Sequence, residues 1–326
     1  MKLRVVLITG LGLALALYLV MYVGVGAVFS AAIAVGWSGF AILCLYALGV
    51  FLLLGCAWYV LLPDSSTRPW VLVWARMVRD AAADVLPFSQ LGGILLGVRA
   101  AMLHGVATSL AFASMIVDVT TEMLAQIIYV ALGVVLLSAR APRSSLAASL
   151  TTLFLIGLVL ATFAGILLVA VQRYGHRITA KLAAHILPGA VAPTAALAAR
   201  FDAIYGSPAR VGLSATLHLA GWIASAIGTW IAFRLIGVHV DIASVLAIES
   251  LVCATRSAAA FIPNALGVQE AAYALLAPLF GIGVESGLAV SLLKRARDVA
   301  IGAPILLIWQ AVEGRRPVAA GPAAST

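Results

Sequence analysis

Charged residues are scarce in this chain of 326 residues. Asp, Glu, Lys and Arg together make up 10% of the sequence, whereas about a quarter of the residues in a soluble domain are charged. Hydrophobic residues make up 64%. Several uncharged stretches reach the length of about 20 residues that crosses a hydrocarbon core. The composition therefore excludes an ordinary soluble domain and predicts a polytopic membrane protein.

The sequence also has few residues of the kinds that bind metals or carry out catalysis. Its cysteines, Cys44, Cys56 and Cys253, all lie in apolar segments without metal-ligand spacing, so we expect small buried side chains. Gly92 and Gly93 are not followed by the Lys-Ser/Thr pair of a phosphate-binding loop. There is no paired set of catalytic carboxylates and no nucleophile with a base. We therefore expect neither an enzyme nor a bound metal or cofactor.

The net charge of +8 has a simpler explanation than nucleic-acid binding. The basic residues lie at the ends of apolar stretches, as the positive-inside rule describes. With both termini in the cytoplasm, most basic residues lie on the cytoplasmic side, and Arg140, Arg143 and Arg234 lie outside. The pattern predicts a multi-pass protein of the bacterial inner membrane with cytoplasmic N- and C-termini.

The apolar pattern predicts an all-α protein with a single membrane domain over residues 1–316 and a disordered tail over 317–326. Six segments read as transmembrane helices: 5–28, 38–62, 106–138, 146–171, 211–236 and 284–312. Two further apolar regions, 70–104 and 240–281, are broken in the middle by proline and glycine. We interpret each as a re-entrant helical hairpin, because irregular backbone at membrane depth needs protein or water around it. The alternative is two ordinary helical pairs, which would give up to ten spans.

A short segment occurs twice in the chain. It reads AAADVLPFSQLGG around Pro87 and SAAAFIPNALGVQ around Pro263, and the two prolines lie 176 residues apart. The hairpin breaks would thus be Pro87, Gly92 and Gly93 in the first copy and Pro263 and Gly267 in the second. Such duplication is typical of transporters built from two structural repeats.

The boundaries of the two units follow from this duplication. We expect one repeat over 38–138 and the other over 211–312, with a linking helix at 146–171. Because one helix separates the repeats, the second is inverted relative to the first. The sequence thus predicts inverted-topology repeats, an architecture that supports alternating access.

Ionisable residues inside apolar segments are functional candidates, because each costs at least ~2.5 kcal/mol at mid-membrane. Asp118 and Glu122 lie four residues apart and so share one face of the helix 106–138. The corresponding helix of the second repeat carries four charged residues: Lys294, Arg295, Arg297 and Asp298. We expect acidic groups of one repeat to neutralise basic groups of the other. Arg295 or Arg297 is also a candidate for contact with an anionic headgroup.

The second hairpin carries its own charged face. Glu249 and Arg256 lie seven residues apart on the helix that leads to the second break. The guanidinium of Arg256 suits bidentate contact with a phosphate or carboxylate, or an internal pair with Glu249 or Glu270. Together with polar residues at the breaks, the candidate substrate contacts are Arg256, Glu270, Arg295, Arg297, Gln90 and Asn264. The predicted charge network comprises Asp118, Glu122, Lys294, Asp298 and Glu249.

The segments VLPFSQLGG, ASMIVDVTTEMLAQ and FIPNALGVQE resemble the flippase-like integral membrane family, which includes the transmembrane region of lysylphosphatidylglycerol synthases. The pair RMVRDAAADVLPFSQLGG and VDVTTEMLAQ is most similar to the hopanoid-biosynthesis-associated branch. The resemblance covers residues 5–312 and implies movement of lipids between leaflets. It does not imply aminoacyl transfer, which belongs to a separate soluble domain that we do not expect here.

These observations lead to one expected function and two alternatives. We expect an inner-membrane lipid translocase that moves hopanoids or other polar-headed lipids, with membrane lipids and lipid-biosynthesis enzymes as partners and no nucleic acid. A secondary transporter of a small solute is the first alternative, favoured by a sealed cavity. A non-catalytic membrane partner of lipid-modifying enzymes is the second.

Overall fold

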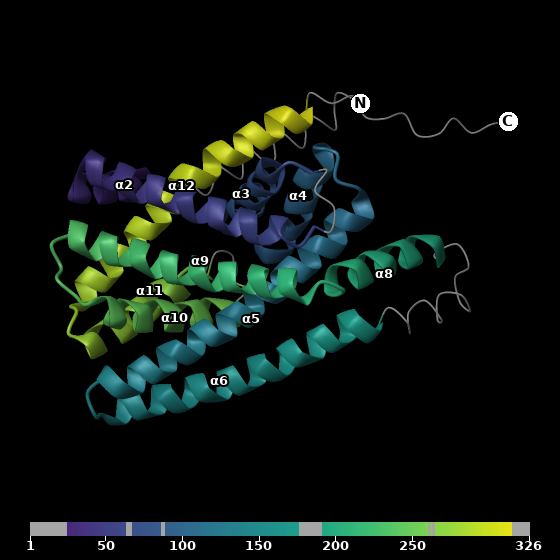
Figure 1. Ribbon diagram of the computed structural model, residues 1–326. Coiled ribbons are helices and arrows are strands. Elements are labelled where there is room, and N and C mark those ends of the chain that lie inside the picture. The colour runs from purple at the N-terminus through teal and green to yellow at the C-terminus, as the bar shows by residue number, and fades with distance from the viewer. Residues whose placement is uncertain are drawn as a thin grey trace.

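The fold is a bundle of helices (Figure 1). The computed structural model describes residues 25–62, 67–85, 89–175, 191–259, 262 and 265–314, and these residues contain no strand. The all-α class is therefore confirmed. The helices are α2 (Val25–Tyr59), α3 (Pro69–Val85), α4 (Ser89–Leu103), α5 (Thr108–Arg140), α6 (Ser145–Ala170), the π-helix η1 (Val171–Gly175), α8 (Val191–Tyr205), α9 (Pro208–Leu235), α10 (Ile242–Ala258), α11 (Val268–Leu276), the 3₁₀ helix η4 (Ala277–Phe280) and α12 (Val284–Gly314).

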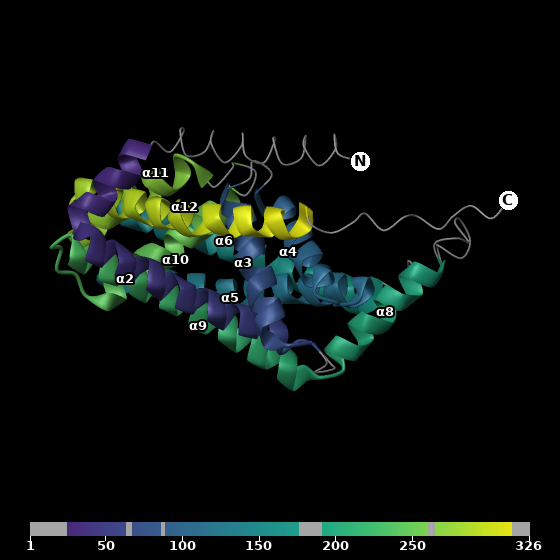
Figure 2. The same cartoon turned by 90° about the horizontal axis from the view of Figure 1, so that it is seen from above.

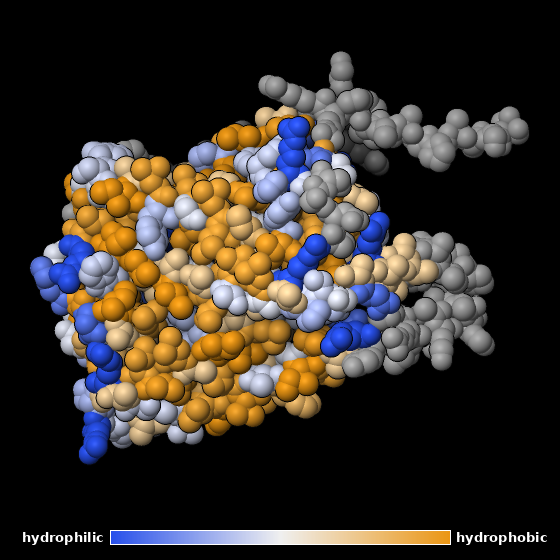
Figure 3. Space-filling view, viewed as in Figure 1, coloured by the Kyte–Doolittle hydropathy of each residue, from blue (hydrophilic) through white to orange (hydrophobic). Residues whose placement is uncertain are grey.

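Four of the described helices are long and apolar enough to cross a membrane. They are Val35–Tyr59, Thr108–Arg140, Ser145–Arg173 and Pro208–Leu235, and they correspond to four of the six predicted spans. The predicted span 284–312 forms α12, whose charged residues keep it out of this group. The predicted span 5–28 lies almost wholly outside the described residues, as does the tail 317–326. Apolar residues cover the middle of the visible face, and polar residues gather at its two ends (Figure 3).

Polar contacts identify the two ends of the bundle. At one end, Arg210 at the start of α9 donates a hydrogen bond to the carbonyl oxygen of Leu62, just after α2, at 2.9 Å. The opposite end holds the Arg140–Asp241 ion pair at 2.8 Å, which joins the end of α5 to the start of α10. We call these the α2–α9 end and the α5–α10 end. Figure 2 shows α8 leaving the bundle at an angle.

Asp241 also caps α10. Its carboxylate accepts hydrogen bonds from the amides of Ala243 and Ser244, both at 3.1 Å, and from the Ser244 hydroxyl at 2.6 Å. Partial burial raises the pKa of this carboxyl, but these hydrogen bonds and the nearby Arg140 guanidinium outweigh burial. The pKa of Asp241 therefore lies below its ordinary value.

The two regions that contain the predicted breaks each form a pair of short helices. α3 has 17 residues and α4 has 15, and the two pack together along their lengths. α3 follows α2 directly, and the Arg99–Glu313 ion pair at 2.7 Å joins the second half of α4 to the end of α12. α10 starts at the α5–α10 end, and α11 with η4 leads to the start of α12. Pro87 and Pro263 lie outside the described residues.

Glycine allows close approach at two packing contacts. A Cβ atom on Gly93 would lie 2.6 Å from the carbonyl oxygen of Arg79, so the contact between α4 and α3 requires glycine there. A Cβ atom on Gly133 of α5 would lie 1.8 Å from the Ser250 Oγ of α10. Gly267, with φ of 77°, occupies the left-handed conformation that starts α11. The predicted break at Gly267 thus coincides with a helix start.

Candidate functional site

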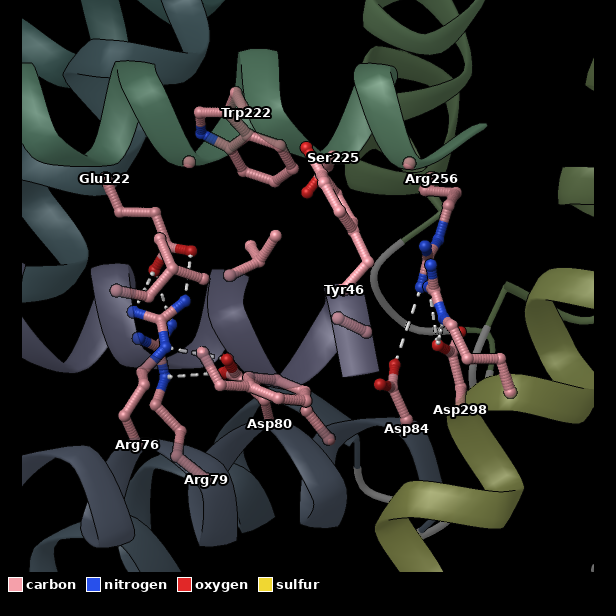
Figure 4. A pocket seen from close by; sticks show the side chains of 18 residues that line it. Tyr46, Arg76, Arg79, Asp80, Asp84, Glu122, Trp222, Ser225, Arg256 and Asp298 are labelled. Atoms are coloured by element: carbon pink, nitrogen blue, oxygen red, sulfur yellow. Dashed lines mark hydrogen bonds and ion pairs between the residues drawn. The ribbon is translucent and has the colours of Figure 1, made fainter. Parts of the chain in front are cut away.

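A charged cavity lies among α2, α3, α5, α9, α10 and α12 (Figure 4). Its volume is about 210 Å³. Its walls carry four arginines and four carboxylates, together with Tyr46, Phe51 and Trp222. The charged lining residues are Arg76, Arg79, Arg256, Arg297, Asp80, Asp84, Glu122 and Asp298. A cavity lined by equal numbers of both charges lies inside a molecule whose exterior is largely apolar.

One wall of the charged cavity is an ion network between α3 and α5. The Arg76 guanidinium contacts Glu122 at 2.6 Å and Asp118 at 3.2 Å, and its Nε donates to Asp80 at 2.7 Å. Arg79 contacts Glu122 at 2.7 Å and Asp118 at 3.2 Å. Arg76 and Arg79 lie one turn apart on α3, so both guanidinium groups reach the same face of α5.

Asp118 lies behind this wall, and its side chain is fully buried. Its Oδ2 bridges the two arginines, and its Oδ1 lies 2.9 Å from Nε2 of His218 on α9. A further contact between α5 and α9 follows one turn on, where the hydroxyls of Thr121 and Ser214 lie 3.0 Å apart. The carboxylate of Asp118 therefore ties α3, α5 and α9 together.

At the opposite wall, the C-terminal end of α3 meets the C-terminal end of α10. Arg256, in the last turn of α10, lies 3.6 Å from Asp84, near the end of α3. Arg297 and Asp298 of α12 pair with each other at 2.7 Å beside them. The side chains of Arg256 and Asp84 are 33% and 27% exposed, compared with 3% for Arg76, so the Arg256–Asp84 pair is the more accessible. Figure 4 shows this group facing the Arg76–Glu122 network across the cavity.

Two further ion pairs lie outside the charged cavity. Glu249 of α10 accepts hydrogen bonds from the Tyr273 hydroxyl and from Lys294 Nζ, the latter at 2.5 Å. Lys294 Nζ also donates to the Tyr273 hydroxyl at 2.9 Å. This triad joins α10, α11 and α12 through buried or nearly buried side chains.

The second of these pairs fixes the start of α11. Arg295 of α12 holds Glu270 through two nitrogens, one of them at 3.0 Å from Oε2. The same guanidinium donates to the carbonyl oxygen of Ala265 at 3.2 Å. Glu270 in turn accepts from the amide of Gly267 at 2.9 Å, completing a capping contact. Arg295 and Glu270 thus hold the backbone after the second break.

The predicted site residues fall into separate groups. Arg256, Arg297, Glu122 and Asp298 line the charged cavity, and Asp118 supports it. The remaining charged candidates form the two pairs outside it: Glu249, Lys294, Glu270 and Arg295. Pro87, Pro263, Asn264 and the side chain of Gln90 lie outside what the structure describes. Gly92 and Gly93 fall in the first turns of α4.

The ionic partners differ from those expected. Asp118 and Glu122 form ion pairs with arginines of α3, in their own half of the chain, and not with the basic residues of α12. The prediction that they neutralise basic groups of the other repeat is therefore wrong for these two residues. The partners of Arg256 include Asp84, which the sequence did not indicate. The Arg256–Asp84 contact does join the two halves of the chain.

Sequence reasoning missed four cavity residues of α3 and the histidine behind them. Arg76 and Arg79 looked like surface charges of a cytoplasmic segment, yet they are only 2% and 6% exposed. A signal was present: Arg76, Asp80 and Asp84 recur every four residues and so form one charged stripe on an otherwise apolar helix. His218 gave no such signal, because no charged residue of α9 lies within one helical turn of it.

Four apolar helices of spanning length, three of which line the charged cavity, define a multi-pass α-helical membrane protein. The sequence model of the family described as the lysylphosphatidylglycerol synthase TM region matches residues 5–305. The chain therefore belongs to this family, as its sequence predicted. No curated protein and no solved structure gives a match.

Proposed function

We propose that this protein is a lipid translocase of the bacterial inner membrane that moves a polar-headed lipid, such as a hopanoid derivative, between leaflets. The observation that carries the proposal is the charged cavity, where the ends of the two short-helix pairs meet. A lipid headgroup crossing the hydrocarbon core needs a polar surface along its path, since an unpaired charge there costs at least ~2.5 kcal/mol. The charged cavity supplies that surface.

The lengths of the short helices support a re-entrant arrangement. At 1.5 Å per residue, the 17 residues of α3 extend about 25 Å, less than a hydrocarbon core of about 30 Å. The α3–α4 pair enters from the α2–α9 end, and the α10–α11 pair enters from the α5–α10 end. Their tips meet at Asp84 and Arg256. Two inverted repeats built in this way can expose one cavity to each side in turn.

The charge balance of the cavity favours a headgroup without net charge. Each of the four lining arginines lies within 4 Å of a carboxylate, so an anionic headgroup would have to displace a carboxylate from its arginine. A zwitterionic or polyhydroxylated headgroup can bind both charges without leaving one buried and unpaired. The Arg256–Asp84 pair is the most exposed ion pair among the described residues of the cavity, and its 3.6 Å separation is longer than the shortest contact of the other three arginines, so it is the pair that a headgroup separates first.

The orientation follows from the same charge distribution. The α2–α9 end carries Arg99 and Arg210, among other basic residues, and the opposite end carries Arg140 and Arg234. The positive-inside rule applied to the whole chain puts the α2–α9 end in the cytoplasm. The first hairpin then opens to the cytoplasm and the second to the outside. No aminoacyl transfer is part of this proposal, and an ion or lipid gradient would supply the energy.

The test is leaflet exchange in reconstituted liposomes. Purified protein is inserted into vesicles with fluorescent phosphatidylethanolamine, phosphatidylglycerol or an amino-polyol hopanoid, and outer-leaflet label is quenched with dithionite. We expect exchange of the zwitterionic or hopanoid probe, with loss of most of the rate in Arg256→Ala. Arg99→Ala is the matched control, because its ion pair with Glu313 lies outside the cavity and is exposed. Accumulation of a small solute without lipid exchange would instead establish the solute-transporter alternative.

A further inference from the structure

A second, apolar cavity of about 850 Å³ lies among α5, α6, α10 and α11. Its size is within the range of sites that hold small molecules. Almost all of its lining residues are apolar, and the polar exceptions are one glutamine, one threonine and one serine. The lining includes Met123, Ile127, Leu153, Phe154, Leu158 and Leu275.

The apolar cavity and the charged cavity share a wall. On α5, Glu122 lines the charged cavity, while its neighbour Met123 lines the apolar one. On α10, Arg256 lines the charged cavity, and the residues on either side, Thr255 and Ser257, line the apolar one. The last turn of α10 and the middle of α5 therefore separate two spaces of opposite character.

The polar groups of the apolar cavity are concentrated at this wall. Gln126 Nε2 of α5 donates a hydrogen bond to Ser257 Oγ of α10 at 2.5 Å. The third polar residue, Thr255, donates to the carbonyl oxygen of Leu251 in its own helix. The Gln126–Ser257 contact joins α5 to α10 at the edge of the apolar cavity, next to Arg256 in sequence, and it is exposed, so side-chain rotation would open it without moving a helix.

The far side of the apolar cavity faces an apolar exterior. α6 packs mainly on α5. Only 6% of its most apolar stretch of 18 residues is buried inside the molecule. Its outward side chains, such as Val159 and Phe163, are 66% and 68% exposed. Gly157 faces the cavity, and a Cβ atom there would meet nothing within 4 Å. In a bilayer this helix separates the cavity from lipid chains.

We propose that the two cavities form one bipartite site for an amphiphile. The hydrocarbon tail lies in the apolar cavity, and the headgroup passes the Gln126–Ser257 contact to reach Arg256 and Asp84. A lipid tail fits because the lining offers no polar partner away from the shared wall. A peptide segment there would bury unsatisfied backbone groups. This inference rests on the proposed function and assigns the tail a place that the charged cavity alone does not give.

Photolabelling in nanodiscs tests the tail site. The probes are a phosphatidylcholine with a diazirine at the end of one acyl chain and a diazirine fatty alcohol, which lacks the headgroup. Labelled residues are mapped by mass spectrometry on the full chain. We expect both probes to label side chains of α5, α6 and α11 that line the apolar cavity. Gly157→Trp should reduce this labelling several-fold, whereas Val159→Trp, on the outward face of α6, should leave it unchanged.

The headgroup half of the site needs its own comparison. Arg256→Ala should weaken labelling by the phosphatidylcholine probe several-fold and leave labelling by the fatty alcohol unchanged. Labelling by the phosphatidylcholine probe that stays at its wild-type level in Arg256→Ala would show that the headgroup does not reach the charged cavity, and would overturn the bipartite site. Ala161→Trp, which also lines the apolar cavity, replaces Gly157→Trp if that variant does not fold.

Failure of this inference is distinguishable from failure of the translocase proposal. Labels confined to the outward face of α6 and insensitive to Gly157→Trp would overturn the tail site, even in protein that exchanges lipids. Cavity labelling that Gly157→Trp abolishes, in protein that exchanges no lipid, would leave the tail site standing and refute translocation.

Discussion

Replacement of Asp118 by asparagine tests whether the ion network between α3 and α5 is as tightly coupled as its geometry indicates. The substitution keeps the shape of the side chain and removes its charge. Asp118 is fully buried, contacts both Arg76 and Arg79 at 3.2 Å and lies 2.9 Å from His218. Removing one partner of a buried ion pair leaves uncompensated charge, which costs about 3–5 kcal/mol. We expect a loss of unfolding free energy of this size.

A second substitution tests whether the loss of unfolding free energy in Asp118→Asn comes from the lost charge. Arg79→Met in the Asp118→Asn background removes one arginine together with one carboxylate, so the net charge of the network is the same as in the wild type. We expect the double variant to be about 2 kcal/mol more stable than the sum of the single effects predicts. Glu313→Gln, in the exposed pair with Arg99, should cost less than about 1 kcal/mol and serves as the control.

The assay is equilibrium unfolding in mixed micelles, followed by circular dichroism as the SDS fraction increases. Each variant is measured with the wild type in the same detergent. A loss below about 0.5 kcal/mol for Asp118→Asn, equal to that of an ordinary surface substitution, would refute the coupled network. Additive effects of Asp118→Asn and Arg79→Met would refute it as well.

Two further predictions concern packing and capping. Gly133→Ala should cost about 1–3 kcal/mol in the same assay, because the new Cβ would overlap Ser250, whereas Gly157→Ala meets no neighbour and should be neutral or stabilising. Asp241→Ala should cost about 1 kcal/mol at neutral pH through loss of the cap of α10. Because the pKa of Asp241 is lowered, its charge stabilises the fold above its ordinary pKa, and this contribution disappears as pH falls through the lowered value. A wild-type minus Asp241→Asn difference that did not shrink on acidification would contradict this reasoning.

The sequence predicted the fold class and the helix ends more closely than it predicted the site. Hydrophobic runs placed the long helix at 106–138, and α5 spans Thr108–Arg140. Helix limits can be predicted from the sequence because they depend on nearby residues: the length of the apolar run, and the proline and glycine residues at its ends. The partners of Asp118 and Glu122 depend on how α3 is rotated against α5. Helical periodicity shows which residues of one helix share a face, but it does not show which face of another helix they meet.

The 176-residue correspondence gains a physical meaning from these contacts. Asp118 of α5 corresponds in sequence to Lys294 of α12, so the same position carries opposite charges in the two halves. In each half the short helix supplies the complementary charge: Arg76 of α3 pairs with Asp118, and Glu249 of α10 pairs with Lys294. If the two short-helix pairs exchanged places, Arg76 would face Lys294, and Glu249 would face Asp118. Like charges buried together cost several kcal/mol, so the reversed charges match each short-helix pair to its own long helix while their tips share one cavity.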